Sequence, residues 1–427
     1  TLEPGELTEG GFGRYRASDY ADLIDHPVEM GEFNEFSFPV RGVEHRLAIT
    51  GRHRVDGERL CTDLARICEQ QARLFGTLPL RRYLFLITAV GDGYGGLEHR
   101  DCTSLMCQRD HLPQPGQSAV SEGYRRFLAL CSHEYLHLWN VKRIRPAVFA
   151  GNALDREVHT RLLWAFEGIT SYYDELCLVR SGCIDQKSYL QLLAEGITRV
   201  VRTPGRFKQS LAESSFDAWT KFYKQDENAP NALVSYYTKG ALVALALDLT
   251  LRQRSAGART LDDLMRALWQ RYGQEEKGVP EDGVERLAQE IAGFDLREFF
   301  DRAVRGTEDL DLAGLLAGVG VEMRLRPQRD DADNGGAVDA FEAVSAKPWL
   351  GIRLVPKQVE PAIAHVLADT PAQRAGLSAG DSLVAIAGLR VTPANWRALV
   401  EAVPPGEPVE VYAFRRDELM TFRVTPR

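Results

Sequence analysis

Two histidines spaced four residues apart lie in the segment Ser132-His-Glu-Tyr-Leu-His137. On a helix, residues four apart project from nearly the same face, so His133 and His137 can direct their imidazoles at one point. Two imidazole nitrogens in this arrangement are typical ligands of Zn²⁺. Glu134, between them, is suited to take a proton from water as a general base. The motif predicts zinc-dependent hydrolysis, although so short a pattern also occurs by chance.

A third metal ligand is predicted further along the chain. A catalytic zinc site takes a third protein ligand and keeps one position open. Glu167 lies among apolar residues in the stretch Trp164-Ala-Phe-Glu-Gly-Ile, where an unpaired carboxylate would be costly. Gly168 follows it, and a glycine inside a predicted helix indicates the close approach of another backbone. We therefore expect Glu167 to bind the metal; the alternatives are a pair with Arg161 or exposure to solvent.

The elements that must position these residues follow from hydrophobic periodicity and from capping residues. We expect residues 1–30 to be irregular. In chain order the pattern predicts strands within 31–51, a helix at 56–75, strands at 80–90 and near 97–99, and helices at 121–139, 155–181 and 232–254. Ser121 is the expected N-cap of the first metal-binding helix, and Thr260 with Asp263 resembles a capping box.

These elements predict an α+β protein with a small sheet followed by a helical half. We assign residues 1–120 to the β-rich part and 121–328 to the helical, metal-binding part of one catalytic domain. Residues 329–345 are charged, contain glycine and lack periodicity, which favours a linker. Residues 346–427 then form a separate β-rich module.

Composition narrows the function classes. The chain of 427 residues is 44% apolar and 26% charged, with a net charge of −8, which argues against nucleic acid as a partner. Its most apolar stretch, 241–251, is too short to span a membrane. None of the seven cysteines forms a Cys-x-x-Cys pair, which favours free thiols in a reducing compartment. We expect a cytoplasmic location, with a periplasmic one as the alternative.

The motifs taken together resemble a known family. His-Glu-x-x-His followed by Glu167 on a later helix resembles the gluzincin metallopeptidases. The longer strings HEYLHLWNVKRIRP and WAFEGITSYY resemble the glycyl aminopeptidase family of zinc enzymes, over almost the whole chain. The resemblance implies a thermolysin-like catalytic domain and a C-terminal PDZ domain. Because members of that family carry a β-domain before this region, it also implies that the chain lacks an N-terminal part, as does its start at Thr1.

The resemblance also implies roles for residues outside the metal site. Gly95, Gly96, Glu98 and His99 are similar to a strand in related aminopeptidases that aligns the substrate, whose glutamate binds the free α-amino group. The alternative is a Glu98 that faces water on its strand.

Tyr237-Thr-Lys-Gly240 resembles a motif whose tyrosine donates to the oxyanion of the tetrahedral intermediate. Tyr236 is a rival for that role, and a pair of core tyrosines is the structural alternative.

The C-terminal module resembles bacterial PDZ domains. The segment Pro371-Ala-x-x-Ala-Gly-Leu-x-x-Gly-Asp381 is similar to their signature, and Leu350, Gly351 and Ile352 match the loop that binds a peptide carboxylate. The resemblance implies a peptide C-terminus as a possible ligand of this module.

The predicted function is a zinc aminopeptidase that removes N-terminal glycine or other small residues from peptides with a free N-terminus. One alternative is an endopeptidase to which the PDZ module delivers substrates. The other is an inactive scaffold that binds peptides, which the intact pair of histidines with Glu134 disfavours.

Overall fold

The structure is a computed structural model that describes residues 2–8, 10–151, 155–330, 332–338, 340–341, 343–404 and 406–427. The chain divides into two compact units. Unit 1 comprises Thr1–Leu193 with Tyr236–Asp301, and unit 2 comprises Ala194–Ser235 with Arg302–Arg427. The protein has the predicted mixed α+β class, while the boundaries drawn from the sequence at 120, 328 and 345 stay predictions.

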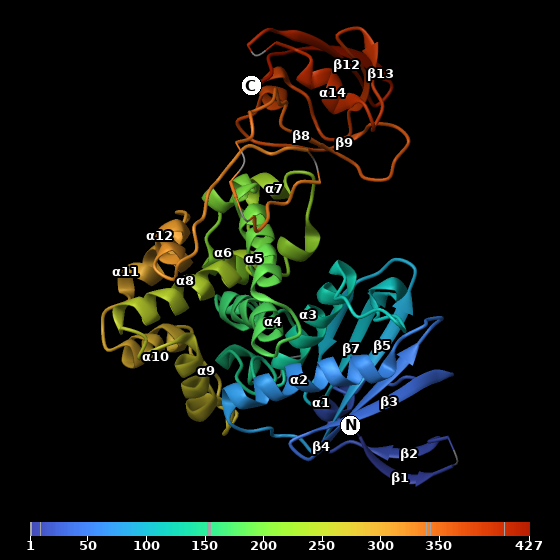
Figure 1. The fold of residues 1–427 in the computed structure, drawn as a ribbon, viewed down its shortest axis with the longest axis vertical. Helices are drawn as coiled ribbons and strands as arrows, with labels where there is room; N and C mark the ends of the chain where they lie inside the picture. Colours follow the sequence, from blue (N-terminus) through green and yellow to red (C-terminus); the bar gives the residue numbers. More distant parts are fainter. Residues whose placement is uncertain are drawn as a thin grey trace. The chain divides into compact units, whose positions relative to one another are not determined.

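The first part of the chain holds the strands β1 to β7 with α1 and α2 between them, helices follow, and strands return from β8 onward (Figure 1). The strands are β1 (Glu3–Leu7), β2 (Gly13–Arg16), β3 (Phe33–Val40), β4 (Val43–Thr50), β5 (Arg82–Val90), β6 (Gly95–Glu98), β7 (Cys102–Gln108), β8 (Ile352–Leu354), β9 (Ile363–Val366), β10 (Ser382–Ile386), β11 (Leu389–Arg390), β12 (Val409–Arg415) and β13 (Glu418–Val424). The α-helices are α1 (Tyr20–Ile24), α2 (Gly57–Phe75), α3 (Glu122–Leu136), α4 (Ile169–Arg180), α5 (Gln186–Val201), α6 (Leu211–Phe216), α7 (Ala229–Ala232), α8 (Thr238–Arg254), α9 (Leu261–Leu268), α10 (Gly283–Ala292), α11 (Arg297–Phe300), α12 (Leu312–Ala317), α13 (Pro371–Ala375) and α14 (Trp396–Glu401). Short 3₁₀ or π turns are η1 (Arg109–His111), η2 (Ala147–Phe149), η3 (Trp164–Gly168), η4 (Pro204–Phe207), η5 (Phe222–Lys224), η6 (Trp269–Gly273) and η7 (Asp301–Arg305).

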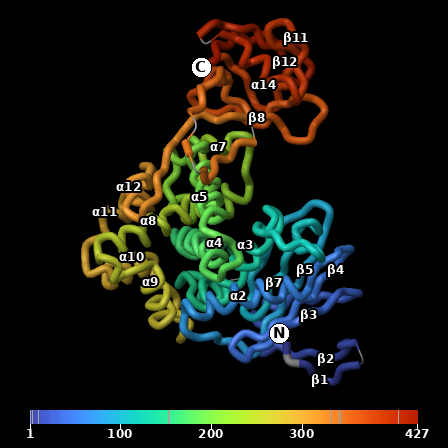
Figure 2. Tube along the Cα trace, in the orientation of Figure 1, coloured from blue at the N-terminus to red at the C-terminus, as the bar shows by residue number. Residues whose placement is uncertain are grey.

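A five-stranded sheet forms the β-rich part of unit 1, in the order β3-β4-β5-β7-β6. β4, β5 and β7 are parallel neighbours, whereas β3 and β6 are antiparallel edge strands. Figure 2 shows the path from β4 through α2 to β5, the helical crossover that parallel strands require. The edge position of β6 matters for the site, because its outer side can accept another strand.

The helix α2 fixes one face of this sheet. It begins after Asp56, whose side chain accepts a hydrogen bond from Arg59 N, and it ends at Gly76 in the left-handed conformation. Leu60, Leu64 and other apolar residues on one side of α2 are fully buried. The structure thus confirms the helix predicted at 56–75.

The first metal-binding helix, α3, also begins where the sequence predicts. The Ser121 side chain accepts a hydrogen bond from Tyr124 N and caps the helix. The helix ends at Leu136, so His133 and Glu134 lie in its last turn and His137 is its C-cap. Trp139, just beyond, is buried and stacks on Phe75 of α2 with ring centroids 4.7 Å apart. This packing anchors the C-terminal end of α3.

One sequence prediction about the elements is wrong, and two predicted helices begin later than expected. Residues 1–30 were expected to be irregular, but they contain β1, β2 and α1. The helix predicted at 155–181 begins only at Trp164, as the π-helical turn η3 that continues into α4, and residues 152–154 lie outside the described part. The helix predicted at 232–254 is present as α8 and ends at Arg254 as expected, but it begins only at Thr238. The capping box of Thr260 and Asp263 is confirmed.

The C-terminal part of unit 2 is a small β-rich module. Its strands form a four-stranded sheet in the order β11-β10-β12-β13 and a β8–β9 pair, with α13 and α14 between strands. Trp349 N and Arg427 O are hydrogen-bonded, so the two ends of the module meet. The described residues of 329–345 form no helix or strand, in line with a linker; residues 331, 339 and 342 are not described.

Two further expectations concern the whole chain. Among the described residues, no helix combines the length and the apolar character needed to cross a membrane. The seven cysteines are all free thiols, and all except the half-buried Cys61 are buried, as predicted.

Candidate metal centre

The three predicted metal ligands converge in unit 1. His133 Nε2 lies 3.3 Å, and His137 Nε2 3.2 Å, from the same Glu167 carboxylate oxygen. Each of the three side chains offers a donor atom, and these atoms all lie within 4.8 Å of one another. Glu167 is therefore turned toward the two histidines, which favours the predicted ligand set over the alternatives raised by the sequence.

The other ring nitrogen of each histidine is also engaged. His133 Nδ1 lies 3.0 Å from Asp174 Oδ2, and His137 Nδ1 lies 2.7 Å from the Asn140 carbonyl oxygen. Both partners accept hydrogen bonds, so each Nδ1 carries a proton, and each Nε2, directed at Glu167, is left to bind either a proton or a metal. Metal-binding histidines are usually held in this way. Two nitrogen atoms and one carboxylate oxygen so oriented fit a zinc ion.

The charges of the cluster also fit a cation. Burial raises the pKa of the Glu167 carboxyl, but the two imidazoles outweigh burial and hold that pKa well below its usual range. Burial disfavours the charged form of His137 as well, yet Glu167 outweighs it and raises the pKa of His137 to about 9. The carboxylate thus attracts positive charge to this point, and a divalent cation would take the place of the imidazole protons.

Glu134 lies beside this cluster, against the strand β6. It is buried, and burial together with the nearby Glu98 and Glu167 carboxylates raises its pKa to about 7, against the opposing effect of the two histidines. Gly96 of β6 lies so close that a Cβ atom there would overlap the Glu134 carboxylate. The observed position of the Glu134 carboxylate therefore requires a glycine at residue 96, since a side chain there would overlap it.

The strand β6 carries the residues predicted to bind substrate. Gly95 pairs with Met106 of β7, and Glu98 pairs with Thr103. Glu98, Glu134 and His137 form a second group whose donor atoms lie within 4.8 Å of one another. Glu98 is thus turned toward the metal cluster and not simply toward water.

His99 occupies a different environment just past the end of β6. It is buried, and its Nδ1 lies 3.4 Å from Asp25 Oδ1. This contact links His99 to the N-terminal segment, and its predicted contact with substrate stays a prediction.

Tyr237 borders the cluster on another side, and its ring centroid lies 6.2 Å from that of His133. Tyr236 is fully buried and stacks on Tyr237, with centroids 4.6 Å apart. Of the two tyrosines, Tyr237 is the one with this ring contact to a metal ligand and the less buried one, which favours it over its rival.

Close backbone packing supports the segment that carries Glu167. A Cβ atom on Gly168 would lie 2.6 Å from Gly240 Cα of α8, so the approach expected from this glycine is confirmed. Asn140 adds a second tie, because its side-chain amide donates to Phe166 O at 3.1 Å and to Thr170 Oγ1 at 3.1 Å. Asn140 thus joins the loop after His137 to the element that carries Glu167.

Sequence reasoning missed Asp174 and Asn140. Asp174 could have been found, because it lies seven residues, or two helical turns, after Glu167 and therefore on the same face. Asn140 gave no comparable signal, since it acts from a loop whose path cannot be read from periodicity.

A network of charged residues joins the strand end at Glu98 to the loop after His137. Asp25 accepts a hydrogen bond from Arg100 N at 2.8 Å and pairs with Lys142 Nζ at 2.6 Å. Arg143 donates to Arg100 O at 3.1 Å and to Leu138 O at 2.8 Å. These bonds fix residues next to Glu98 against residues next to His137.

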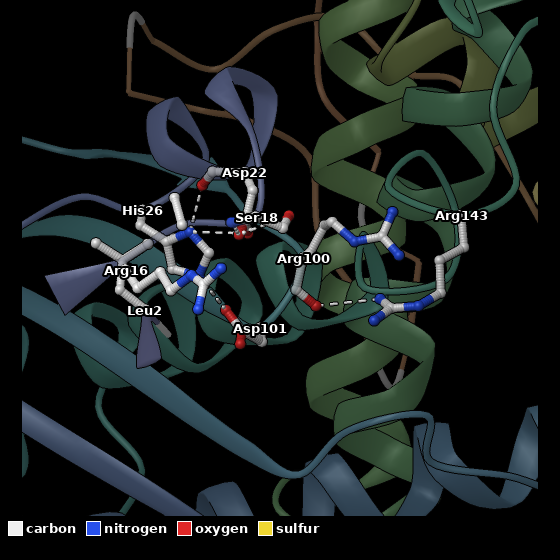
Figure 3. A pocket seen from close by; sticks show the side chains of 9 residues that line it. Leu2, Arg16, Ser18, Asp22, His26, Arg100, Asp101 and Arg143 are labelled. Atoms are coloured by element: carbon white, nitrogen blue, oxygen red, sulfur yellow. Dashed lines mark hydrogen bonds and ion pairs between the residues drawn. The ribbon is translucent and has the colours of Figure 1, made fainter. Parts of the chain in front are cut away.

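A cavity of about 470 Å³ opens beside this network (Figure 3). His26 Nε2 lies 3.3 Å from Asp101 Oδ1 at its wall, and Figure 3 shows Arg100 and Arg143 on the other side. The residues that line the cavity are Leu2, Arg16, Ala17, Ser18, Asp22, His26, Arg100, Asp101 and Arg143. None of them is a predicted metal ligand, so this cavity is separate from the metal centre. The predicted carboxylate loop, Leu350, Gly351 and Ile352, lies in unit 2 and is also not part of the metal centre.

Comparison with known proteins is consistent with this geometry. The family model of the M61 glycyl aminopeptidases matches residues 126–243. This range includes all three predicted metal ligands. An aminopeptidase N family protein from Idiomarina loihiensis is 40% identical; the match covers 100% of this chain and 72% of that one, with a TM-score of 0.94.

A more distant structure is an M1 zinc metallopeptidase from Deinococcus radiodurans. It is 17% identical, the match covers 66% of this chain and 54% of that one, and the TM-score is 0.45, too low to support an argument. A search of curated proteins gave no match.

The fold and the family matches together define a peptide hydrolase. Within that class, the chain belongs to the M61 glycyl aminopeptidase family.

Proposed function

We propose that this protein is a zinc-dependent aminopeptidase that removes N-terminal glycine or another small residue from peptides. The observation that carries the proposal is the convergence of His133 Nε2 and His137 Nε2 on one oxygen of Glu167. The partners of both Nδ1 atoms support it, because they orient the two Nε2 lone pairs for a metal. We further propose that the catalytic part is thermolysin-like.

His133, His137 and Glu167 would hold the zinc ion. When bound, the ion would supply Lewis-acid activation of the attacking water and of the scissile carbonyl. Glu134 accepts the proton from the attacking water and passes it to the leaving amine. Tyr237 donates a hydrogen bond to the developing oxyanion, which strengthens as negative charge forms there.

The aminopeptidase specificity rests on Glu98 and on the edge strand β6. A peptide that adds to the outer side of β6 forms backbone hydrogen bonds with the segment that includes Gly95 and Gly96. Its α-ammonium group then meets the Glu98 carboxylate, whose side chain lies close to Glu134 and His137. A blocked N-terminus leaves Glu98 without its cation, so an internal peptide bond is disfavoured. The preference for glycine rests on the family alone.

We also propose that residues 346–427 form a PDZ module with a loop at Leu350, Gly351 and Ile352 that binds a peptide carboxylate. Gly351 supports this reading, because its φ of +85° and its contact with Thr370 exclude a larger residue from the loop. The pairing of Ile352 with Val366 makes β8 a strand beside which a peptide could add.

The proposal is tested by release of p-nitroaniline from Gly-, Ala- and Leu-p-nitroanilide, with zinc content measured in parallel. We expect Gly to be preferred, activity to fall on chelation, and activity to return with zinc. Glu134→Gln is expected to keep its zinc and to lose about 10²–10⁴-fold in kcat. Equal turnover by this variant would remove Glu134 as the base.

A second comparison separates the two peptidase hypotheses. An N-acetylated peptide should resist the enzyme while the same peptide with a free N-terminus is cleaved. Cleavage of both would favour the endopeptidase, and a protein that binds no zinc and cleaves neither would favour the scaffold.

A further inference from the structure

The strand β8 pairs with one strand, β9, in the part of the chain that the structure describes. Leu367 N donates to Gly351 O, and bonds of this kind in an antiparallel pair involve every second residue. Gly351 and Arg353 therefore bond to β9, whereas the backbone N–H and C=O groups of Ile352 and Leu354 point away from it. This second edge of β8 is the one along which a peptide could add.

The proposed carboxylate loop fixes the direction of such a peptide. Because the loop of Leu350, Gly351 and Ile352 lies at the start of β8, a peptide whose C-terminus is held there runs along β8 in the opposite direction. Its last residue then lies beside Ile352, and its penultimate residue lies beside Arg353. Residues that face each other across two antiparallel strands project to the same side, so the penultimate side chain meets that of Arg353. The Ile352 side chain, on the other side, is buried.

Arg353 is accessible to solvent and lies beside a second arginine of the same unit. Its Nη2 donates to the Arg202 carbonyl oxygen at 3.2 Å. Arg202 in turn donates to Asp333 O and, at 3.5 Å, to Asn334 Oδ1, which are both neutral oxygens. The Asp333 carboxylate is held by Arg326, with Nη2 and Oδ1 2.9 Å apart. Among the described residues, no carboxylate lies within ion-pair distance of Arg353.

The pKa values of two arginines also indicate an excess of positive charge here. Partial burial and the neighbouring Arg202 lower the pKa of Arg353. Arg397 belongs to α14 in the same module. Burial lowers its pKa, Glu401 and Asp330 oppose this, and Arg202 adds to it. Guanidinium groups that repel one another in this way are stabilised by an added anion, so the position beside Arg353 favours a carboxylate.

We propose that the C-terminal module selects peptides whose penultimate residue is aspartate or glutamate, and that Arg353 binds this acidic side chain. The inference rests on the proposed PDZ module and deepens it, because it names the class of peptide. The pair forms a charge-assisted hydrogen bond next to the positive charge of Arg202. The preference is a local property of this face, since the whole chain carries a net charge of −8 and does not attract acidic peptides in general.

The test measures the binding of N-acetylated peptides to the full chain by fluorescence anisotropy. Ala-Ala-Ala-Glu-Val and Ala-Ala-Glu-Ala-Val carry the same charge and differ only in the position of the acid, and Ala-Ala-Ala-Gln-Val is the neutral reference. We expect the first peptide to bind about fivefold more tightly than each of the others, and this difference to shrink in about 0.5 M salt. Equal binding of the two Glu peptides would indicate nonspecific attraction and would overturn the proposal.

Two variants separate Arg353 from positive charge elsewhere in the module. Arg353→Gln is expected to bind the two Glu peptides equally. Arg423→Gln removes the same charge from an exposed position of β13 and should keep the fivefold preference. A preference that persists in Arg353→Gln, or one that is lost in both variants, would overturn the proposal.

A C-terminally amidated form of Ala-Ala-Ala-Glu-Val distinguishes this proposal from the proposed carboxylate loop. We expect the amide to bind at least tenfold more weakly than the free acid, because it lacks the charge that the loop holds. Equal binding of the amide and the acid would overturn both the loop and the acidic preference. Weaker binding of the amide together with equal binding of the Glu and Gln peptides would overturn the acidic preference alone.

Discussion

At the scale of single residues, the proposed metal centre depends on residues outside its three proposed ligands. Asp174 holds His133 through Nδ1, and the Asn140 carbonyl holds His137 in the same way. Because an imidazole can rotate and change tautomer, such partners decide whether Nε2 is available as a ligand. The two histidines differ in this respect, since one is held by a charged side chain and the other by backbone.

We expect Asp174→Asn to weaken zinc binding by about 10–100-fold, because the neutral amide is a poorer acceptor for the His133 Nδ1 proton. With saturating zinc, kcat should return close to the wild-type value. Competition with a chelator of known affinity measures the effect. Glu175→Gln, at the next position of α4, is the control and should bind zinc like the wild type; equal affinity of all three proteins would contradict a supporting role for Asp174.

The convergence of His133, His137 and Glu167 was predictable from the sequence, because a short motif and an isolated acid among apolar residues each carry a strong physical requirement. The choice between Tyr236 and Tyr237 was not predictable from the sequence. The side chains of two neighbouring residues at the start of a helix point in different directions, and these directions can be assigned only when the backbone is known. Asp174 was predictable in principle from its spacing to Glu167.

At the scale of elements, β6 and α3 approach each other at a single glycine. A methyl group on Gly96 would overlap the Glu134 carboxylate, so either the strand or the base must move. This packing explains how an edge strand can lie directly over the reacting groups. It also makes the strand sensitive to the smallest substitution.

We expect Gly96→Ala to lower kcat by about 10-fold or more, because the displaced Glu134 no longer meets the attacking water. Zinc content should not change, since the three proposed ligands lie at the C-terminal end of α3 and in η3. Gly196→Ala in α5, where a Cβ atom would meet nothing within 4 Å, is the control. Steady-state kinetics with metal analysis decides, and a wild-type kcat for Gly96→Ala would show that Glu134 tolerates the shift.

The elements themselves were only partly predictable. The N-cap of α3 was predicted, because Ser at the start of a helix has a specific hydrogen-bonding role. The π-helical turn that carries Glu167 was not, since periodicity arguments assume a regular α-helix and a wider turn breaks the register. The short elements within residues 1–30 were not predicted, because they bury almost no apolar side chains and so leave no periodic pattern in the sequence.

At the scale of the whole molecule, a buried histidine links the sheet to the metal-binding helix. His45 of β4 is fully buried; its Nε2 accepts from Tyr135 O–H at 2.8 Å and its Nδ1 donates to Val43 O at 3.0 Å. Phe38 stacks on it at 5.2 Å. Burial lowers the pKa of His45 from 6.5 to about 4, although the Val43 carbonyl opposes this.

Between these two pKa values the unfolded chain binds a proton that the folded chain does not, so stability is full above pH 6.5 and falls as the pH drops toward 4. We expect His45 to contribute a loss of about 2 kcal/mol in the free energy of unfolding between about pH 7.5 and about pH 5. Denaturant unfolding at both pH values measures this loss. His45→Gln should show a pH dependence smaller by that amount, and an unchanged dependence would contradict the assignment.

The order of residues along the chain has a consequence for synthesis. Ala194–Ser235 is made well before Arg302–Arg427, the stretch with which it forms unit 2. As a chain leaves the ribosome from its N-terminus, the nascent segment must wait without its partner while Tyr236–Asp301 is translated. The hydrogen bonds that join the two stretches, such as those of Asn231 with Val366 and Ala368, are therefore among the last to form.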